Sequence, residues 1–399
     1  MSDLRFNAQR PQRNSRPYHQ LTLRAVTAML LCPLLACSDA DPAAETPDVE
    51  ADTDIGTDTD IGTDTAIEAD TVPTDTTAAD AADGSTPADA IAIPDYDSDV
   101  RINEITMRCT HNSYHRRPEL LADSSHDYEH APLDVQLGEQ GVRAFELDVH
   151  AGDGFPVFHI PFGVDDLTTC ANIGECLGTI STWSRANPGH HLVVVWVEIK
   201  DELDLERITD YAAYDAAVRA VVPEDQLYTP LDFRRGLESE RASVDALGWP
   251  TVDETRGQIL VVLLDTDEPH ASGYRAWSES SGDPVMFTRA DDDQYGESWA
   301  VLAKINNPTA AAEIAAAHAA NMLIASNTGS PSGTVEDNQS RRNQGIQNGV
   351  HMLCDDFPAP VPERDPNDWL DLAGGSPSIC NQVTASPECQ TRDIERQSD

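Results

Sequence analysis

The chain has 399 residues and an acidic composition, with 26 Lys and Arg residues, 70 Asp and Glu residues and a formal net charge of −44 at pH 7. A field of this sign repels nucleic acid and strongly anionic membranes, and it attracts cations. The length allows two or three domains of about 150 residues, or one α/β barrel of about 250 residues together with segments that do not fold.

Residues 1–36 have the layout of an export signal. Five arginines and one acid precede the apolar stretch 25–36, which is too short for a transmembrane helix of about 20 residues. The stretch ends in Leu-Leu-Ala before Cys37, which resembles a bacterial lipobox with Cys37 as the lipidated residue. The alternative is an ordinary secretory signal with a chance cysteine. Because Ser38 gives no inner-membrane retention signal, the sequence predicts an exported lipoprotein of the outer membrane or cell surface, held by an N-terminal lipid anchor.

An acidic tether is predicted for residues 37–100. The stretch 38–100 holds 19 Asp and Glu residues and no Lys or Arg, in a run dominated by Ala, Thr, Asp and Pro. Such a composition cannot bury enough apolar surface to offset chain entropy, so we expect it to be disordered. The echo Asp-Ile-Gly-Thr-Asp-Thr could instead be a calcium repeat, but it lacks the Gly and distal Glu positions of an EF-hand loop.

Short apolar runs alternate with helical stretches from residue 101 to 358, the pattern of repeated β-α units. The expected strands are 101–110, 142–149, 191–199, 258–265, 284–288, 299–305, 321–326 and 349–354. The expected helices are 133–139, 177–186, 203–222, 244–248, 309–320 and 338–348. Eight strands with crossovers predict an α/β fold, a (β/α)8 barrel of the TIM type, with irregular units between 258 and 305. Residues 359–399 are proline-rich at first and are expected to form a C-terminal tail or cap.

Six cysteines remain in the mature domain once Cys32 and Cys37 are set aside, and an even number in an exported protein suggests up to three disulfides. Buried free thiols are the alternative. The pairing that we predict is Cys170 with Cys176, Cys380 with Cys389, and Cys109 with Cys354. The last pair joins the first barrel strand to the last, which are neighbours only if the barrel closes.

Polar side chains follow the first three predicted strands. The first strand ends in Thr-His-Asn-Ser-Tyr-His, which contains His111 and Asn112. Chemistry in a barrel lies at the carboxyl ends of the strands, so such a tip fits an active site, although a His-Asn pair alone is also common in solvated turns. Period-two alternation places Glu146 and Asp148 of the second strand on one face. Two carboxylates that face the same space repel each other unless a cation lies between them.

Two further side chains extend this set. His159 follows the carboxylate pair closely enough to return over the same barrel mouth, and Glu198 closes the apolar run of the third strand. Lys200 could simply pair with Glu198. The resulting oxygen donors are one amide and three carboxylates, from Asn112, Glu146, Asp148 and Glu198. Hard oxygen donors favour Ca²⁺, and less so Mg²⁺, over zinc, and leave the two histidines available for proton transfer.

The order and spacing of these residues resemble the calcium-dependent phosphoinositide-specific phospholipases C, in particular bacterial exported members. The residues that carry the resemblance are His111-Asn112, Glu146-x-Asp148, His159, Glu198 and the late Asp356-Phe357-Pro358. The resemblance covers about residues 102–358. It implies Asn112, Glu146, Asp148 and Glu198 as calcium ligands, and His111 and His159 as the catalytic pair, with Glu146 or Asp148 accepting the proton of the inositol 2-hydroxyl. A cyclic inositol phosphate would form first.

The sequence also departs from that family. Eukaryotic relatives hold ring phosphates with two lysines near the fourth strand and a later arginine, but 257–264 contains no basic residue. The late strand gives Ile324-Ala325-Ser326-Asn327 where exported relatives often show an arginine. An unphosphorylated phosphatidylinositol, or another phosphodiester altogether, therefore fits better than a polyphosphorylated lipid. Lys200 and Arg289 remain candidate phosphate contacts, as do Lys304 and the Arg341-Arg342 pair, although ion pairing is the alternative role for each.

Two rival functions stay open. A glycerophosphodiester phosphodiesterase uses the same barrel with glycerol's hydroxyl as the nucleophile, so the expected partner is a phospholipid or a glycerophosphodiester. The other rival is a catalytically silent surface-binding lipoprotein whose acidic tether holds a calcium-loaded module away from the cell.

Overall fold

The computed structural model of the protein describes residues 99–201, 203–204, 206–265 and 269–395. The predicted signal peptide, Cys37 and nearly all of the predicted tether lie outside these residues. Among the described residues, no helix has both the length and the apolar character needed to cross a membrane.

Eight parallel strands form a nearly closed barrel, as the sequence predicted. Along the sheet the order is β5-β4-β3-β2-β1-β8-β7-β6, and a single parallel bridge between Arg289 and Leu302 links the two ends. The barrel strands are β1 Ile105–Thr110, β2 Ala144–Val149, β3 Val193–Ile199, β4 Ile259–Leu263, β5 Met286–Thr288, β6 Leu302–Lys304, β7 Leu323–Asn327 and β8 Met352–Asp355.

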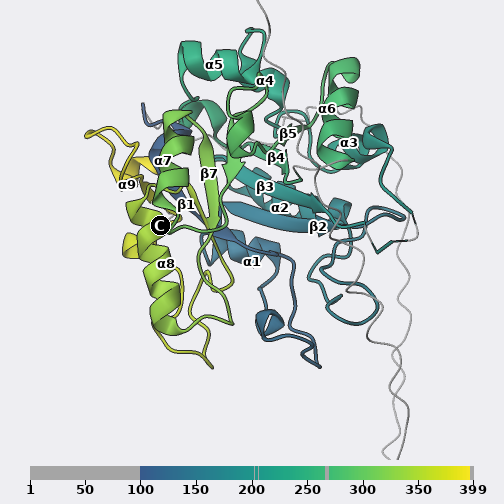
Figure 1. The fold of residues 1–399 in the computed structure, drawn as a ribbon, viewed down its shortest axis with the longest axis vertical. Coiled ribbons are helices and arrows are strands. Elements are labelled where there is room, and N and C mark those ends of the chain that lie inside the picture. Colours follow the sequence, from purple (N-terminus) through teal and green to yellow (C-terminus); the bar gives the residue numbers. More distant parts are fainter. Residues whose placement is uncertain (1–98, 202, 205, 266–268, 396–399) are drawn as a thin grey trace, which may run out of the picture. The chain divides into compact units, whose positions relative to one another are not determined.

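Helices surround the strands (Figure 1). They are α1 Leu133–Gly138, α2 Ile173–Ala186, α3 Tyr211–Arg219, α4 Pro230–Arg234, α5 Glu240–Leu247, α6 His270–Ser281, α7 Ala311–Ala319, α8 Val335–Gln347 and α9 Thr391–Ile394. Short 3-10 turns occur at η1 Ile102–Glu104, η2 Ser124–His126, η3 Asp253–Thr255, η4 Asp292–Gln294 and η5 Ala373–Gly375.

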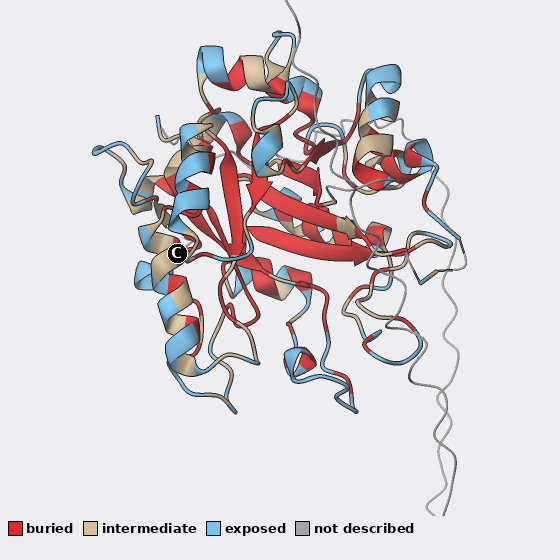
Figure 2. Ribbon diagram, in the orientation of Figure 1, coloured by how far each residue is buried: buried red, intermediate tan, exposed pale blue. Residues whose placement is uncertain are grey.

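The strands are buried on both faces, which is why they appear in the sequence as continuous apolar runs (Figure 2). Side chains that alternate along each strand divide into an outer layer under the helices, which includes Val195 and Leu147, and an inner layer. In the inner layer Trp196, Leu260 and Phe287 fill the barrel. The interior is therefore a packed core, and only polar side chains at the strand ends are available for chemistry.

The expected strands all occur, but some helices differ from the sequence prediction. The helix expected over 203–222 spans only Tyr211–Arg219. The carboxylate of Asp201 accepts hydrogen bonds from Arg207 and from the backbone N–H of Ile208, and the side chain of Asp210 caps the first turn. These bonds hold the preceding segment out of the helix. Helices α4, α6 and α9 and strand β9 Ser378–Cys380 were not predicted.

The three predicted disulfides are confirmed: Cys109–Cys354, Cys170–Cys176 and Cys380–Cys389. Cys109 and Cys354 are direct register partners on neighbouring strands β1 and β8. The C-terminal segment turns back so that β9 pairs antiparallel with β1, and Cys380 at its end is bonded to Cys389.

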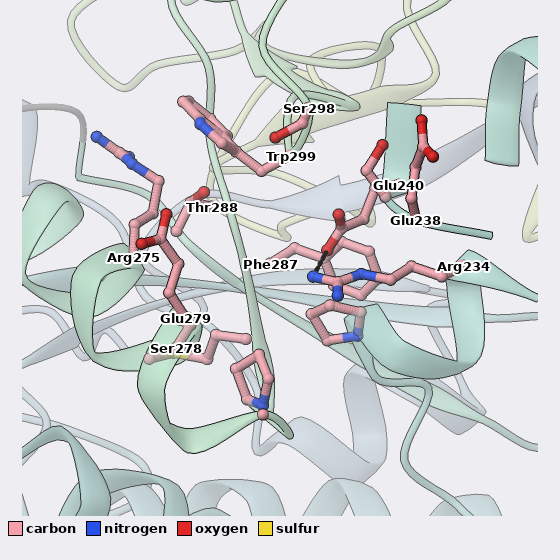
Figure 3. A pocket seen from close by; sticks show the side chains of 15 residues that line it. Arg234, Glu238, Glu240, Arg275, Ser278, Glu279, Phe287, Thr288, Ser298 and Trp299 are labelled. Atoms are coloured by element: carbon pink, nitrogen blue, oxygen red, sulfur yellow. Dashed lines mark hydrogen bonds and ion pairs between the residues drawn. The ribbon is translucent and has the colours of Figure 1, made fainter. Parts of the chain in front are cut away.

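The irregular unit expected between 258 and 305 leaves a pocket on the barrel. The connection 289–301, all of it described, holds only the turn η4 and no covering helix. A pocket of about 350 Å³ lies there beside β5, between α4–α5 and α6 (Figure 3). Arg234, paired with Glu240, lines one side, and Arg275 lies over the ring of Trp299 on the other. Its lining residues include none of the site residues predicted from the sequence.

Candidate active site and metal centre

Charged side chains from several strands meet at the carboxyl end of the barrel. Glu146 and Asp148 lie on β2, and Glu198 lies on β3 as the direct register partner of Asp148. Phe145 and Leu147 point to the outer layer, as the alternation of the strand requires. The three carboxylates each offer an oxygen within 4.8 Å of the others. We call Glu146, Asp148 and Glu198 the carboxylate cluster.

Two lysines neutralise part of this charge. Lys304, from the end of β6, places Nζ 2.6 Å from Glu146 Oε2, and both side chains are buried. Lys200 places Nζ 2.7 Å from Asp148 Oδ2 and 3.7 Å from Glu198 Oε2. The ion pairing expected as the alternative role for these lysines is therefore present, but it is formed within the cluster itself.

The electrostatics of the cluster favour one more positive charge. Burial raises the pKa of Glu198, and the neighbouring Asp148 raises it further, to about 7. Burial also acts to raise the pKa of Glu146, but Lys304, His111 and Lys200 together more than offset it, so this pKa lies below its ordinary value. The two ammonium groups thus lie against Glu146 and Asp148 and leave Glu198 under-compensated.

One oxygen of Asp148 shows where a cation fits. Asp148 Oδ2 accepts a hydrogen bond of 2.8 Å from the Tyr114 hydroxyl, whereas buried Oδ1 has no hydrogen-bond partner among the described residues. A buried carboxylate oxygen without a partner is costly. The three carboxylates of the cluster supply hard oxygen donors, which calcium prefers, so the cluster fits the ion that the sequence predicted.

Asn112 lies in the turn after β1, with a left-handed backbone φ of 43°. Its side chain is buried and lies close to the Tyr128 hydroxyl. The next residue joins the turn to β2: Ser113 N donates to the Glu146 carbonyl, and Ser113 Oγ accepts from Glu146 N, each at 2.8 Å. The structure thus ties Asn112 to the strand that carries the carboxylates, while its role as a ligand stays a prediction.

His111 is oriented by two buried groups. Its Nδ1 lies 2.9 Å from Asp356 Oδ1, and the Nε2 of His130 lies 2.8 Å from its backbone carbonyl. Burial lowers the pKa of His111, but Asp356 outweighs this effect, so its pKa lies above the ordinary value. Burial also lowers the pKa of His130 to about 3, so this ring is neutral and donates to the carbonyl.

His159 is held by Asp165 on the loop after β2, with Nδ1 2.6 Å from Oδ2. The other carboxylate oxygen is 2.8 Å from His115 Nε2, and His126 Nδ1 lies 3.5 Å from Oδ2. Burial alone would raise the pKa of Asp165, but hydrogen bonds from His115 and His159 lower it well below its usual range. The carboxylate is therefore ionised and fixes the ring of His159.

Two arginines predicted as candidate phosphate contacts, Arg289 and Arg342, bond to groups outside the carboxylate cluster. Arg289 pairs with Asp291 at 2.8 Å and also bonds to the Leu264 carbonyl. Arg342 is buried and pairs with Asp355 and Asp368, which is the structural role given as its alternative. Sequence reasoning missed the groups that orient or hold the predicted residues: Tyr114, Tyr128, His130, Asp165 and, as a partner of His111, Asp356.

Comparisons with known proteins fit this geometry. Residues 151–381, more than half of the chain, match the family model described as "Phosphoinositide phospholipase C, Ca2+-dependent". No curated protein sequence matches the chain. Among solved structures, the fold is similar to a Ca²⁺-dependent phosphatidylinositol-specific phospholipase C from Streptomyces antibioticus. The TM-score is 0.50 at 18% identity over 65% of this chain and 95% of that one.

A calcium-dependent phosphoinositol-specific phospholipase C from a Gram-negative Pseudomonas species is similarly related, with a TM-score of 0.50 and 17% identity over 70% of this chain and 95% of that one. Identities this low show the shared fold, and the family model carries the membership. The chain belongs to the family of calcium-dependent phosphoinositide phospholipases C.

Proposed function

We propose that this protein is a calcium-dependent phosphodiesterase that cleaves the headgroup phosphodiester of a phosphatidylinositol-type lipid through a cyclic phosphate. The observation that carries the proposal is the convergence of three carboxylate oxygens within 4.8 Å at the barrel mouth. The unpartnered Oδ1 of Asp148 lies in this cluster. Histidines oriented by aspartates lie on the loops that follow β1 and β2.

The residues that would hold calcium are Asn112, Glu146, Asp148 and Glu198. Bound there, the ion supplies charge for the phosphoryl oxygen and lowers the pKa of the substrate hydroxyl. Glu146 or Asp148 accepts the proton of that hydroxyl as it attacks phosphorus. The ammonium groups of Lys200 and Lys304, already within the cluster, are available to negative oxygens of the phosphate as charge develops.

The two histidines have separate tasks. His111 donates a hydrogen bond to a phosphoryl oxygen through the nitrogen that does not face Asp356. His159 protonates the departing glycerol oxygen through Nε2, since its Nδ1 faces Asp165. Asp356 and Asp165 are positioning residues: each fixes the tautomer and ring angle of its histidine without reaching the substrate.

Replacing either histidine tests this assignment. His111→Ala or His159→Ala is expected to lower the rate about 10²- to 10⁴-fold, the usual contribution of general acid–base catalysis. His318→Ala, on α7, is the matched control and should keep its rate. Full activity of either site variant, on a substrate that the wild type cleaves, would remove the assignment.

The substrate is tested by comparing two phosphodiesters side by side. Phosphatidylinositol vesicles and soluble glycerophosphoinositol are incubated with the protein in calcium and then in EGTA. Calcium-dependent release of diacylglycerol from the vesicles supports the proposal. Cleavage of glycerophosphoinositol alone would assign a glycerophosphodiester phosphodiesterase, and no turnover of either compound would favour the surface-binding lipoprotein.

The proposed location is the outside of a bacterial cell, on a lipid anchor at Cys37. Three disulfides among the described residues support export, because such bonds persist in oxidising compartments. Metabolic labelling with an alkyne fatty acid should mark the wild type and leave Cys37→Ser unmarked. Equal labelling of both proteins would reject the anchor and leave the enzymatic proposal standing.

A further inference from the structure

A second group of donors near the barrel mouth is rich in nitrogen. His126, His159 and Asp165 each offer one ligand atom within 4.8 Å of the others. We call these three residues the histidine cluster. His126 belongs to the turn η2, between β1 and α1, whereas His159 and Asp165 lie on the loop after β2. The rings of His126 and His159 meet edge to face, with centroids 5.2 Å apart.

His126 contributes an atom that the protein itself does not satisfy. Its side chain is 9% exposed, and its Nδ1 has no hydrogen-bond partner among the described residues. The atom faces Asp165 Oδ2 at 3.5 Å, which is too long for a hydrogen bond. Asp165 already accepts from His159 through the same oxygen and from His115 through the other. A buried nitrogen is thus directed at a carboxylate that is engaged by two other rings.

The spacing suits a four-coordinate metal. With metal–ligand lengths of about 2.0–2.1 Å, two donors 3.5 Å apart, as for His126 Nδ1 and Asp165 Oδ2, subtend about 117° at the ion. The contact between His159 Nδ1 and Asp165 Oδ2 is 2.6 Å, the distance of a hydrogen bond. An ion that replaces the proton of this hydrogen bond requires the pair to open to about 3.3 Å, the separation of tetrahedral ligands at these lengths.

The donor chemistry selects a different ion from that of the carboxylate cluster. Two imidazole nitrogens and one carboxylate oxygen suit zinc and other late divalent metals, whereas calcium prefers oxygen donors alone. Three protein ligands also leave a fourth position open to water, which distinguishes such a site from the closed four-ligand sites that are structural.

We propose that the histidine cluster is a zinc site that inhibits the enzyme when it is filled. This inhibitory effect rests on the proposed function, in which His159 protonates the leaving oxygen. Zinc on His159 Nδ1 replaces the proton that Asp165 now accepts. A ring with a metal on Nδ1 has no nitrogen left for the second proton that it needs in order to donate one. The calcium ligands are not involved, so zinc blocks proton donation and leaves calcium in place.

Metal binding is measured without turnover. The full chain is saturated with calcium and titrated with zinc by calorimetry, and separately with Co²⁺, whose visible spectrum reports four-coordinate nitrogen and oxygen ligation. We expect one zinc ion per chain in the wild type and in Asp148→Asn, which alters only the carboxylate cluster. His126→Phe keeps a ring against His159 but removes Nδ1, and it should weaken zinc binding by about 100-fold.

His270→Phe is the matched control, since His270 is a buried histidine that contacts one aspartate, Asp201. It should bind zinc as the wild type does. Absence of zinc binding to the wild type, or equal binding by His126→Phe, would overturn the site. Loss of zinc binding in Asp148→Asn would also overturn it, by moving the ion to the carboxylate cluster.

The effect is measured on the rate. Zinc added to calcium-saturated enzyme should suppress cleavage in the wild type, whereas the rate of His126→Phe, compared with its own rate without zinc, should be unaffected by zinc. Zinc that binds at the histidine cluster without slowing cleavage would overturn the inhibitory role. Because the binding titrations need no substrate, a failure of the proposed phosphodiesterase activity leaves their result unchanged.

Discussion

The carboxylate cluster and the histidine cluster are close neighbours that are built in different ways. Glu146, Asp148 and Glu198 stand on adjacent strands in fixed register, and two lysines share their charge. The histidine cluster is assembled from two loops, and its carboxylate Asp165 is surrounded by imidazoles. Tyr128 is linked to both: its ring stacks on that of His115, the partner of Asp165, with centroids 4.2 Å apart, and the charges of Asp148 and Asp165 both act on its hydroxyl.

The two clusters therefore suit different tasks. The carboxylate cluster attracts a cation, and the histidine cluster takes part in proton transfer. The carboxylates on the strands concentrate negative charge in a rigid frame, which suits a hard ion. The aspartate on the loop holds a ring in one orientation, which suits proton transfer. If the comparison is right, variants of the two clusters must differ in which kinetic constant they change.

Asp148→Asn is expected to have the largest effect. It removes one charge and weakens the oxygen that we expect to bind the ion, so kcat/KM should fall about 10³-fold, because a catalytic metal contributes several kcal/mol. Calcium titration by calorimetry, together with rates on phosphatidylinositol vesicles, measures this. Asp153→Asn, an exposed neighbour on the following loop, is the control. Unchanged calcium binding by Asp148→Asn would contradict the role of the carboxylate cluster.

Asp165→Asn tests the other side of the comparison. The amide cannot hold His159 as the carboxylate does, so kcat should fall about 10²-fold while KM and calcium affinity stay the same. Asp166→Asn is the matched control, since Asp166 is the exposed adjacent residue and bonds only to Gly163 N among the contacts described. A rise in KM with unchanged kcat would show that Asp165 shapes the loop and does not position the acid.

The same difference explains what the sequence could predict. Glu146, Asp148 and Glu198 end apolar runs, and strict alternation along a strand fixes their side-chain direction, so their meeting point could be inferred before any coordinates. Asp356 follows β8 in the same manner. The sequence indicates Asp356 only as part of the motif Asp356-Phe357-Pro358. The rule used for the other strands, that polar residues at their carboxyl ends meet at the barrel mouth, also places it near His111.

Asp165 and His126 carried no such signal. Their positions depend on loops whose course is set by turns such as the one at Phe162 and Gly163, where the backbone adopts positive φ. For the helices, α6 was missed because its sequence, His-Ala-Ser-Gly-Tyr-Arg-Ala-Trp-Ser-Glu-Ser-Ser, has few strong helix formers. Tertiary packing of Ala271 and Tyr274 against the barrel stabilises it instead.

The stability of the fold at acid pH depends on a charged pair that belongs to neither cluster, that of Glu395 and Arg143. Burial alone would raise the pKa of Glu395, but the Arg143 guanidinium more than offsets it and holds that pKa at about 2, against an ordinary 4.5. The pair therefore stabilises the fold fully above pH 4.5 and loses this contribution as the pH falls toward 2. His191, which also faces Glu395, has its pKa lowered by burial to about 3 and stays neutral over most of this range.

Glu395→Gln should cost about 2 kcal/mol of unfolding free energy at pH 7, because it leaves the buried Arg143 without its counter-charge. Its stability should also depend less on pH between 5 and 2 than that of the wild type. Urea unfolding at several pH values measures both effects, and Glu388→Gln, an exposed acid, is the control. Equal pH dependence of wild type and variant would assign the acid sensitivity to other groups.

Lys200→Met has the smallest expected effect, but it is the most specific test of how the carboxylate cluster binds calcium. Lys200 Nζ lies 2.7 Å from Asp148 and 3.7 Å from Glu198, so calcium must share these oxygens with an ammonium group. Removing that charge should tighten calcium binding about tenfold, and the same change should lower kcat, because a positive group near the phosphate is lost. Calcium affinity thus rises while kcat falls, a combination that a general loss of structure cannot produce. Arg289→Met is the control: it removes a cation that is bonded elsewhere, so it should change neither calcium affinity nor kcat. Weaker calcium binding by Lys200→Met would mean that the lysine organises the carboxylate cluster and does not compete with calcium for its oxygens.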